Sequence, residues 1–281
     1  MTRVTEHMKT NTTFKLALQT LSAVVLGLAS ASSMAATTWN LDSCTGQQAA
    51  NSDTFGNSYK CGTVGNQVTV SAYGAKTVSG STTYDTAFLK QNGASYGFGV
   101  ASRDEGISVS APDHSTDNNP ANGAPDLILL KFDTAVALGS MALGWSQSDA
   151  DITLMAYTGA GGPTITGKTA ATLRSGGAGA GWAMVQNFGD ADAAGSTGYA
   201  SSGTNINYTN ASDVTASWWL ISAYNSGFGG GALDSLSDYV KLMTVASKDV
   251  PGKLPEPASL ALVGLALVGV AGSRRRANKS A

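Results

Sequence analysis

The chain has 281 residues, of which 42% are hydrophobic, 13% are charged and 34 are glycines, and its formal net charge at pH 7 is −2. Between two distinctive terminal segments, 1–35 and 254–281, lie 10 basic and 17 acidic residues, a net charge of −7. This balance disfavours nucleic acid and anionic lipid as partners, because both require a basic surface. It suits a cation or a neutral glycan better.

The N-terminal segment has the order of parts of a secretory signal peptide. Basic residues precede an apolar region over residues 16–28, and Ser33, Met34 and Ala35 follow as a recognition site for signal peptidase. Polar residues interrupt the apolar region, which argues against a permanent membrane anchor. We therefore expect residues 1–35 to be a signal peptide that signal peptidase removes during export.

Residues 36–253 are numerous enough for one large or two small domains, and a single all-β domain is the simpler expectation. Sixteen of the 19 acidic residues of the chain are aspartates, which favour turns and the ends of loops. Glycine, serine, threonine and asparagine dominate the stretches between them and disfavour long helices. We therefore expect short strands joined by many turns, with few helices.

Cys44 and Cys61 are the only cysteines of the chain. Export to an oxidising compartment permits a disulfide, and closing so short a loop stabilises a fold by about 3 kcal/mol. The alternative is a metal-binding or catalytic thiol pair, but such sites use tighter spacing. We expect a disulfide between the two residues.

Short runs of strand-forming residues, bounded by glycine, asparagine, aspartate or proline, mark the predicted strands. Residues 127–132 are nearly all apolar, which predicts a strand that is buried on both faces. The other predicted strands are 67–73, 106–110, 142–145, 151–157, 183–188, 218–224 and 239–246. Many short strands without a long amphipathic helix predict an all-β fold, a two-sheet sandwich with a jelly-roll-like arrangement.

A group of aspartate and asparagine residues, near Trp145 in the sequence, has the composition of a loop-borne cation site. Asp149 and Asp151 are two residues apart, so in an extended chain their carboxylates lie on one face, where solvent, protonation or a cation must relieve their repulsion. Calcium takes roughly six to eight oxygen ligands. The candidate calcium ligands are Asp113, Asp117, Asn118, Asp126, Asp149 and Asp151. The sequence favours a simpler interpretation, a solvated connection in which these residues form turns, and calcium binding is the alternative.

An enzymatic function has few residues to draw on. His114 is the sole histidine of residues 36–253, and a serine triad could use it with Asp113 or Asp117; the alternative is an ordinary loop histidine. Zinc catalysis normally recruits several histidines, and nothing marks a particular pair of carboxylates for glycoside hydrolysis. We therefore expect no catalytic residue, with a secreted carbohydrate-active enzyme as the alternative function.

Trp218 and Trp219 are candidate ligand-binding residues. Neighbouring residues in a strand point to opposite faces of the sheet, so both rings are buried only if both faces are covered. An exposed ring offers an apolar face on which a sugar can stack. The sequence therefore favours one exposed tryptophan, and the alternative is core packing of both.

The C-terminal segment holds three parts in order: Pro255, Glu256 and Pro257, then an apolar run over residues 258–273, then Arg274, Arg275 and Arg276. As a single transmembrane helix the apolar run spans about 24 Å, which barely crosses the hydrocarbon core of a bilayer. The arginines resist translocation, so we expect them on the cytoplasmic side and residues 36–253 on the outer side.

This order of parts resembles the PEP-CTERM sorting signal of Gram-negative surface proteins. The resemblance implies that a membrane transpeptidase, an exosortase, cuts near Pro255, Glu256 and Pro257 and releases the protein to the cell surface or to an exopolysaccharide matrix. It divides the chain into a signal peptide (1–35), an extracytoplasmic domain (36–253) and a sorting signal (254–281). The alternative is a stiff proline spacer before a plain membrane anchor.

Residues 96–157 also resemble a subgroup of exosortase-dependent surface proteins. The shared features are a strand entry at residues 97–100, the Pro112-x-His114-x-x-Asp117-Asn118 sequence, Asp126 before an apolar strand, and Trp145 leading into Asp149 and Asp151. This resemblance implies a β fold and a surface location, and no catalytic role. We therefore expect an exported surface or biofilm-matrix protein, transiently anchored in the inner membrane, with a structural, adhesive or glycan-binding role.

Overall fold

The computed structural model describes residues 36–47, 54–91, 95–108, 110, 112–118, 124–174, 181–189 and 206–249. Residues 36–249 form one compact unit. The signal peptide (1–35), the transmembrane helix (258–273) and the sorting signal expected from the sequence all lie outside the described residues. Within the described ranges, no helix is both long enough and apolar enough to span a membrane.

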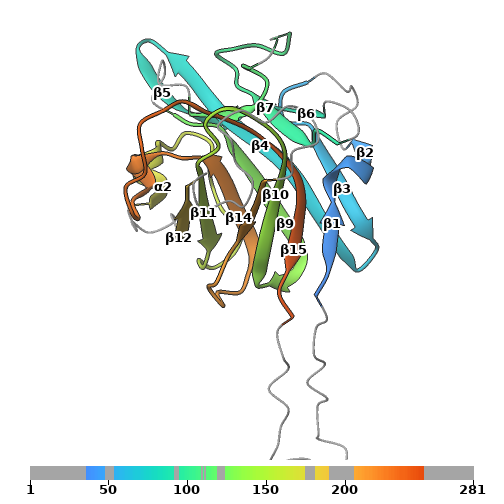
Figure 1. Cartoon of the computed structure of the whole chain (residues 1–281). Helices are drawn as coiled ribbons and strands as arrows, with labels where there is room; N and C mark the ends of the chain where they lie inside the picture. Colours follow the sequence, from blue (N-terminus) through green and yellow to red (C-terminus); the bar gives the residue numbers. More distant parts are fainter. Residues whose placement is uncertain are drawn as a thin grey trace, which may run out of the picture. The chain divides into compact units, whose positions relative to one another are not determined.

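Two antiparallel sheets contain nearly all the regular structure of the described residues (Figure 1). The first sheet has the order β13-β10-β15-β7-β6, with β1 and β8 also paired to β15, and the second has the order β12-β11-β14-β9-β4-β3-β2, with β5 paired to β4. The strands of the first sheet are β1 (Thr38–Asn40), β6 (Phe88–Gln91), β7 (Phe98–Ala101), β8 (Thr116–Asp117), β10 (Leu138–Ser148), β13 (Ile206–Thr209) and β15 (Asp238–Ser247). Those of the second are β2 (Thr45–Gln47), β3 (Ser58–Thr63), β4 (Asn66–Val78), β5 (Ser81–Thr86), β9 (Leu127–Val136), β11 (Ile152–Tyr157), β12 (Trp182–Phe188) and β14 (Ala216–Ala223). The helices are short: η2 (Leu41–Ser43), α2 (Ala170–Arg174) and η4 (Ser226–Phe228).

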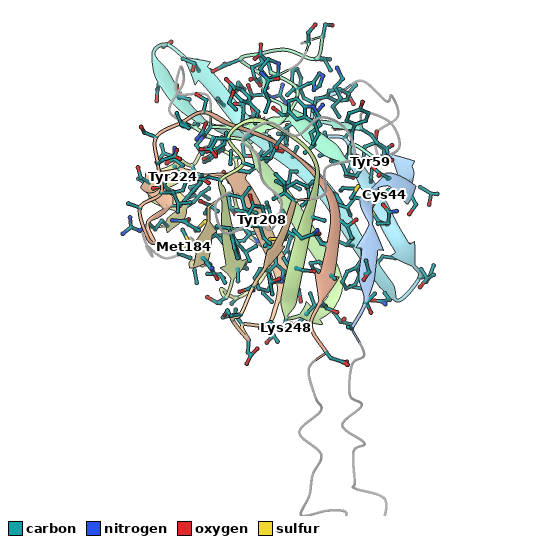
Figure 2. The ribbon with its side chains drawn as sticks, viewed as in Figure 1. Cys44, Tyr59, Met184, Tyr208, Tyr224 and Lys248 are labelled. Carbon is teal, nitrogen blue, oxygen red and sulfur yellow. A yellow bond between two sulfur atoms is a disulfide. The ribbon has the colours of Figure 1, made fainter. Side chains whose placement is uncertain are left out.

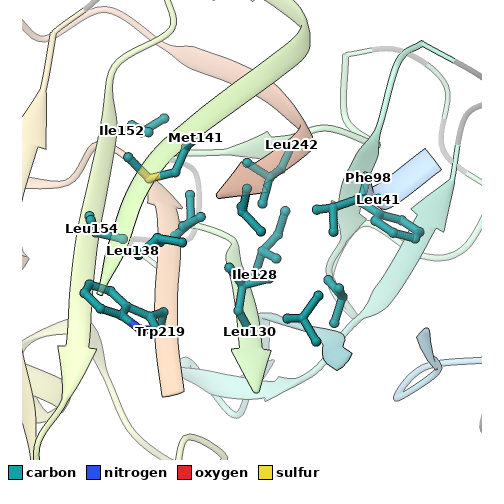
Figure 3. Packing of buried hydrophobic residues seen from close by; sticks show 14 of the residues in the cluster. Leu41, Phe98, Ile128, Leu130, Leu138, Met141, Ile152, Leu154, Trp219 and Leu242 are labelled. Carbon is teal, nitrogen blue, oxygen red and sulfur yellow. The ribbon is translucent and has the colours of Figure 1, made fainter. Parts of the chain in front are cut away.

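The main hydrophobic core lies between the two sheets. Strand alternation builds it, because every second side chain of β9 and β14 points inward, as Ile128, Leu130 and Trp219 do (Figure 3). Leu138 and Leu242 face them from β10 and β15 of the first sheet. Burying an aliphatic side chain of this size stabilises the fold by about 1.5–3 kcal/mol, so the two sheets are held together mainly by this layer.

A second hydrophobic core covers the outer face of the second sheet. Leu127 and Leu129 of β9 point to this side, where they pack with Ile165, Leu173 of α2 and Phe228 of η4. The strand predicted to be buried on both faces is therefore confirmed: residues 127–130 are all buried. The sequence-based expectation of a two-sheet all-β fold with few helices is confirmed as well.

One predicted strand is wrong. Residues 107 and 108 lie in a turn, and Gly106 and Ser110 are outside any strand. The reason is a local hydrogen-bonded turn: the Ser102 amide donates to Glu105 Oε2 at 2.7 Å, and the Gly106 amide donates to the Ser102 carbonyl at 3.0 Å. Gly106 has a φ of 90°, which glycine adopts readily and which ends the extended chain.

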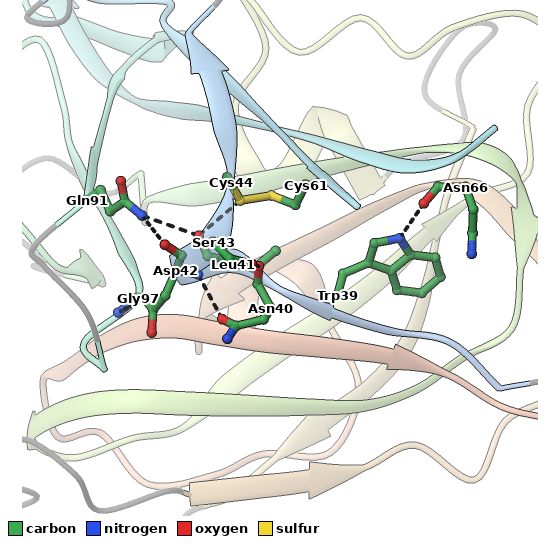
Figure 4. Close-up of a disulfide and its surroundings, with 10 residues drawn as sticks. All are labelled: Trp39, Asn40, Leu41, Asp42, Ser43, Cys44, Cys61, Asn66, Gln91 and Gly97. Atoms are coloured by element: carbon green, nitrogen blue, oxygen red, sulfur yellow. Dashed lines mark hydrogen bonds between the residues drawn. A yellow bond between two sulfur atoms is a disulfide. The ribbon is translucent and has the colours of Figure 1, made fainter. Parts of the chain in front are cut away.

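The disulfide between Cys44 and Cys61 is confirmed, with a Cα to Cα distance of 4.2 Å (Figure 4). It joins the segment after η2 to β3. Nearby hydrogen bonds fix the same segment: the Asp42 amide donates to Asn40 Oδ1 at 2.9 Å, and Gln91 Nε2 donates to the Asp42 carbonyl at 3.0 Å. The N-terminal edge of the sandwich is therefore held by one covalent bond and several polar contacts.

Candidate functional site

Acidic side chains gather at one end of the sandwich. The connection between β10 and β11 lies there beside the first residue of β15, since Asp149 bridges to Asp238. Tyr224, directly after β14, donates its amide to the Asp151 carbonyl at 2.9 Å. This end is not the one at which β15 finishes: Figure 2 shows Tyr224 well away from Lys248, the residue that directly follows β15. The connections at this end therefore bring residues that are far apart in the sequence close together.

The first group, the Asp238 cluster, consists of Asp149, Asp151 and Asp238. One carboxylate oxygen from each residue lies within 4.8 Å of the others. All three residues are buried, with exposed fractions of 3%, 2% and 1%. Two full negative charges at that distance repel each other by about 3.5 kcal/mol at an effective dielectric constant of 20. The cluster therefore requires a bound cation or bound protons.

Backbone amides and one asparagine orient the Asp238 cluster. Asp238 Oδ1 accepts from the Asp151 amide at 2.8 Å, and Asn118 Nδ2 donates to Asp238 Oδ2. Asn118 Oδ1 in turn accepts from the Asp238 amide at 2.9 Å. Asp149 Oδ1 accepts from the Ala150 amide at 2.8 Å, whereas Asp149 Oδ2 is buried and has no N–H or hydroxyl donor within the described part of the chain. Ser148, just before it, has a φ of 63°, a strained conformation for serine.

Burial and mutual repulsion raise the pKa values of this cluster. Burial is the largest influence on Asp238, whose pKa rises to about 9, and the charges of Asp149 and Asp151 add to it. Burial also raises the pKa of Asp149 to about 7. The hydrogen bond from Ala150 opposes the rise, whereas the charge of Asp151, a side-chain hydrogen bond with Asp234 and the charge of Asp234 support it. The folded protein therefore disfavours three bare negative charges at this place.

The second group, the Asp126 cluster, consists of Glu105, Asp117 and Asp126, again with one carboxylate oxygen from each within 4.8 Å of the others. Asp126 is 3% exposed, and its Oδ2 is buried with no hydrogen-bond partner among the described residues. Burial, followed by the charges of Asp117 and Glu105, raises its pKa well above the usual range. Gly74 of β4 leaves the necessary space, because a Cβ there would lie 2.6 Å from Asp126 Oδ1.

The neighbouring residues Asp117 and Asn118 connect the two clusters. Asp117 belongs to the Asp126 cluster, and its carbonyl accepts from the Asp126 amide at 2.7 Å. Asn118 binds Asp238 instead, as consecutive residues of an extended chain point in opposite directions. The two clusters therefore share one short segment of chain.

The structure thus divides the six candidate calcium ligands. It brings Asp149 and Asp151 together in one cluster and Asp117 and Asp126 in the other, while Asn118 hydrogen-bonds to the first. Asp113 belongs to neither cluster. The buried carboxylates differ from the solvated connection that the simpler interpretation requires.

Sequence reasoning missed Glu105 and Asp238. Asp238 lies 87 residues from Asp151 and precedes a strand like many other aspartates, so nothing local distinguishes it. Glu105 carried one signal, since it is the only glutamate of residues 36–253. Its position within a predicted loop before the 106–110 run gave no indication of burial.

A cavity of about 370 Å³ lies beside the Asp238 cluster. It is lined by Asn118, Tyr224 and most of the loop that leads to β15, including Asp234. Asp234 is exposed, and its negative charge raises the pKa of both Asp149 and Asp238, so it lies close to them. The cavity therefore adjoins Asn118 and Asp234, two residues that interact with the cluster.

His114 and Lys241 form a separate, basic neighbourhood. Lys241 is 3% exposed, and its Nζ lies 4.6 Å from the ring centre of Trp145 and 5.9 Å from that of Tyr96. Burial and the charge of Lys90 lower its pKa to about 8. Rings that face a buried ammonium stabilise its charge through their negative faces. Trp145 therefore contacts a lysine in this structure.

Residues 93–97 read Gly-Ala-Ser-Tyr-Gly, which is the Gly-x-Ser-x-Gly spacing of a nucleophile elbow. From the sequence we considered His114 as a member of a serine triad but overlooked this motif. Residues 92–94 lie outside the described ranges. Ser95 precedes β7 in a turn, with a φ of 82°, and its amide donates to Asp42 Oδ2 at 2.8 Å. An elbow connects a strand to a helix, and here a strand follows the serine instead. The motif therefore lacks its usual structural context.

The two candidate ligand-binding tryptophans have different surroundings. Trp219 has no exposed surface, and its Nε1 donates to the Ala216 carbonyl at 3.0 Å. Trp218 is half-buried on the outer side of the sheet, where Lys131 Nζ lies 5.0 Å from its ring centre. Only Trp218 of the pair therefore has a ring surface that solvent can reach.

Comparison with known protein families adds information about a different part of the chain. Residues 254–276 match the family model of the PEP-CTERM protein-sorting motif. The chain carries a PEP-CTERM sorting signal. The identification made from Pro255, Glu256 and Pro257 is thereby confirmed. No curated protein and no solved structure matches the chain.

The PEP-CTERM motif implies export, transient membrane anchoring and processing by an exosortase. It covers less than a tenth of the chain and carries information about trafficking alone. The chemistry of the domain before the PEP-CTERM motif must therefore be inferred from its own side chains.

Proposed function

We propose that this protein is a non-catalytic structural component of the cell surface or extracellular matrix of a Gram-negative bacterium. Signal peptidase removes residues 1–35, a single transmembrane helix over 258–273 holds the chain in the inner membrane, and Arg274, Arg275 and Arg276 stay cytoplasmic. An exosortase then processes the chain near the sorting motif. The observation that carries the proposal is the motif itself, placed directly after a domain with a closed hydrophobic core.

The two-sheet sandwich supports a structural role. We include in the proposal a jelly-roll-like arrangement of its strands, which buries inward-facing side chains of both sheets in one interior. Such a closed interior resists unfolding outside the cell, where no chaperone restores it. The disulfide supports the same role, because it suits an oxidising compartment.

The arrangement of acids favours this role over a glycoside hydrolase. Hydrolases hold two carboxyl groups about 5–9.5 Å apart across an open groove. The clustered carboxylates here are buried and closer together, and Asp234 is the one acid among the residues that line the cavity. The net charge of residues 36–253 supports an exopolysaccharide or another neutral glycan as matrix partner, and disfavours nucleic acid.

Sorting is tested by expressing the full chain in a host with and without its exosortase. With the enzyme, mass spectrometry should find released protein that lacks Arg274, Arg275 and Arg276. Without the enzyme, the intact tail should stay in the inner-membrane fraction. Replacing the motif, Pro255→Ala with Pro257→Ala, should give the same retention in the presence of the enzyme.

Pro163→Ala is a matched control for the sorting experiment, because this proline lies in a loop of the folded domain. It should be released like the wild-type chain. Extracellular protein that still carries its arginine tail would contradict the proposal.

A further inference from the structure

We propose that Asp149, Asp151 and Asp238 bind a calcium ion, which joins the connection between β10 and β11 to the start of β15. The three carboxylates come from two segments far apart in the chain, and each offers one oxygen within 4.8 Å of the others. The proposal concerns the folded domain and does not depend on sorting. It assigns a cation site to the Asp238 cluster as a unit.

An unpaired buried oxygen points directly to a ligand. Asp149 is 97% buried, and its Oδ1 accepts from the Ala150 amide, whereas among the described residues Oδ2 has no N–H or hydroxyl donor. The neighbouring Asp234 carboxyl group hydrogen-bonds to the Asp149 side chain only while one of the two groups holds a proton. Buried acceptors in folded proteins are almost always paired, since an unpaired one forfeits its interaction with water. A cation beside Asp149 Oδ2 supplies the missing partner.

The charges around the cluster call for a cation as well. Among the described residues, no lysine, arginine or histidine forms an ion pair with Asp149 or Asp238; the ion pairs are Lys76 and Arg103 with Asp85, and Lys248 with Asp213. The exposed Asp234 adds another negative charge nearby. A divalent cation offsets two of these charges at the point where they converge.

The ligands are oriented before the ion arrives. The Asp151 amide and Asn118 hold the two oxygens of Asp238, and a second bond from the Asp238 amide to Asn118 Oδ1 fixes the asparagine. A carboxylate oxygen that accepts one hydrogen bond keeps a further lone pair for a metal. Such supporting hydrogen bonds are typical around metal ligands, because they fix the ligand orientation.

A cavity next to the cluster has room for further ligands. The cavity of about 370 Å³ is lined by Asn118 and Asp234, both of which interact with members of the cluster. Water within it, and the Asp234 carboxylate, can complete a coordination shell. The cavity therefore reaches residues that contact the cluster, although none of the three carboxylates lines it.

The chemistry of the ligands selects calcium. Oxygen ligands disfavour zinc, which prefers histidine nitrogen and cysteine sulfur. Magnesium demands near-ideal octahedral geometry and gives up its waters reluctantly, whereas calcium accepts irregular sets of roughly six to eight oxygens. Three carboxylates on two separate segments form such an irregular set.

The test uses the full-length exported protein, treated with a chelator and then freed of it. Calcium chloride and magnesium chloride are titrated separately in a calorimeter, and thermal unfolding is followed at pH 7.5. We expect at least one calcium ion to bind per chain. At a calcium concentration of 100 times the Kd, Tm should rise by about 5–10 °C. Magnesium should raise Tm much less. An unchanged Tm and no binding heat with calcium would overturn the proposal.

Variants assign the binding to this cluster. Asp238→Asn and Asp149→Asn should each abolish most of the calcium-dependent rise in Tm. Asp149→Asn should in addition raise Tm without calcium, because it removes a buried carboxylate and replaces one of its oxygens with an amide donor. Asp133→Asn is the matched control, as Asp133 is exposed and accepts a hydrogen bond from the Gln67 amide. It should keep the full calcium response.

The Asp126 cluster is the other place in the described structure where calcium could bind, so a variant of it tests the assignment. If Asp126→Asn abolishes the calcium response while Asp238→Asn and Asp149→Asn keep it, the assignment to the Asp238 cluster is wrong. If a variant fails to fold, the wild-type titration still decides whether calcium binds at all, and the other variant decides where.

Discussion

At the residue scale, burial changes the charge of side chains that would be ordinary on a surface. His114 shows this most clearly. Burial, followed by the positive charges of Lys241 and Lys90, lowers its pKa to about 4, although Asp113 opposes the shift. Its Nδ1 is buried without a hydrogen-bond partner. His114 is therefore neutral in the folded protein at pH 6, where the same side chain in an unfolded chain is mostly charged.

The neutral His114 predicts a loss of stability in mild acid. The unfolded chain binds a proton near pH 6.5 and the folded chain only near pH 4, so stability present above pH 6.5 is lost as the pH falls toward 4. After discounting for solvent screening of this half-buried group, the loss is about 1 kcal/mol. Urea unfolding of the wild type and of His114→Gln at pH 7 and pH 4.5 measures it.

The comparison between the two proteins isolates the histidine, because the buried carboxyl groups titrate in both. Wild type should lose about 1 kcal/mol more than His114→Gln between the two pH values. Equal losses would show that His114 takes up its proton as easily in the folded chain as in the unfolded one.

Two kinds of information decide which site residues a sequence reveals. Asp149 and Asp151 could be grouped beforehand, because residues two apart in an extended chain share a face. Asp238 could not, since only the pairing of β10 with β15 places it beside them. Local spacing therefore predicts two of the three ligands, and strand pairing between distant segments supplies the third.

At the element scale, β14 shows how a strand covered on both faces uses adjacent tryptophans. Trp219 pairs with Leu130 of β9 and Ala156 of β11, and its ring fills the core between the sheets. Trp218 points to the outer layer, where Lys131 lies over its ring. Alternation predicted the opposite directions, but the covering of the outer face by α2 and η4 depends on residues that no strand pattern reveals.

The two rings predict unequal losses of stability. Trp219→Ala should lower the free energy of unfolding by about 3–5 kcal/mol, because it leaves a large cavity in the core. Trp218→Ala should lower it by about 1 kcal/mol, since that ring is only partly buried. Chemical denaturation of both variants measures the difference, and equal losses would contradict the assignment of faces. A polysaccharide pull-down with folded Trp218→Ala tests glycan stacking in the same material.

The failed strand at residues 106–110 has an element-scale cause too. Alternating Ile107 and Val109 favoured an extended chain, yet the turn closed by Ser102 and Glu105 precedes them directly. That turn places Glu105 in the Asp126 cluster. The formation of a polar cluster therefore overrides the weak strand preference of five residues.

At the scale of the whole domain, the chain passes repeatedly from one sheet to the other. β9 and β10 are consecutive yet lie in different sheets, with Ala137 alone between them, and β14 and β15 do the same through a longer connection. Composition and strand number predicted two sheets, but the allocation of strands to them follows from these crossings. The Asp238 cluster lies where the chain crosses from β10 to β11 and from β14 to β15. A calcium ion there would therefore stabilise the sandwich as a unit.

The first crossing of the chain is the one that the disulfide secures. β1 pairs with β15 in the first sheet, and β2 pairs with β3 in the second, so the chain changes sheets between Asn40 and Thr45. Cys44 lies within this short passage and binds Cys61 of β3. Because the bond shortens the loops available to the unfolded chain, it should stabilise the whole domain by about 3 kcal/mol.

Reduction should therefore lower Tm by about 6–12 °C, given a shift of about 2–4 °C per kcal/mol for a domain of this size. Thermal unfolding with and without reductant measures this, and the double variant Cys44→Ala with Cys61→Ala is the control. The control should unfold at the lower temperature under both conditions, since it has no bond to lose. A reductant effect of equal size in the double variant would mean that the stabilisation comes from elsewhere, whereas a difference confined to the wild type assigns it to the bond at the crossing between the sheets.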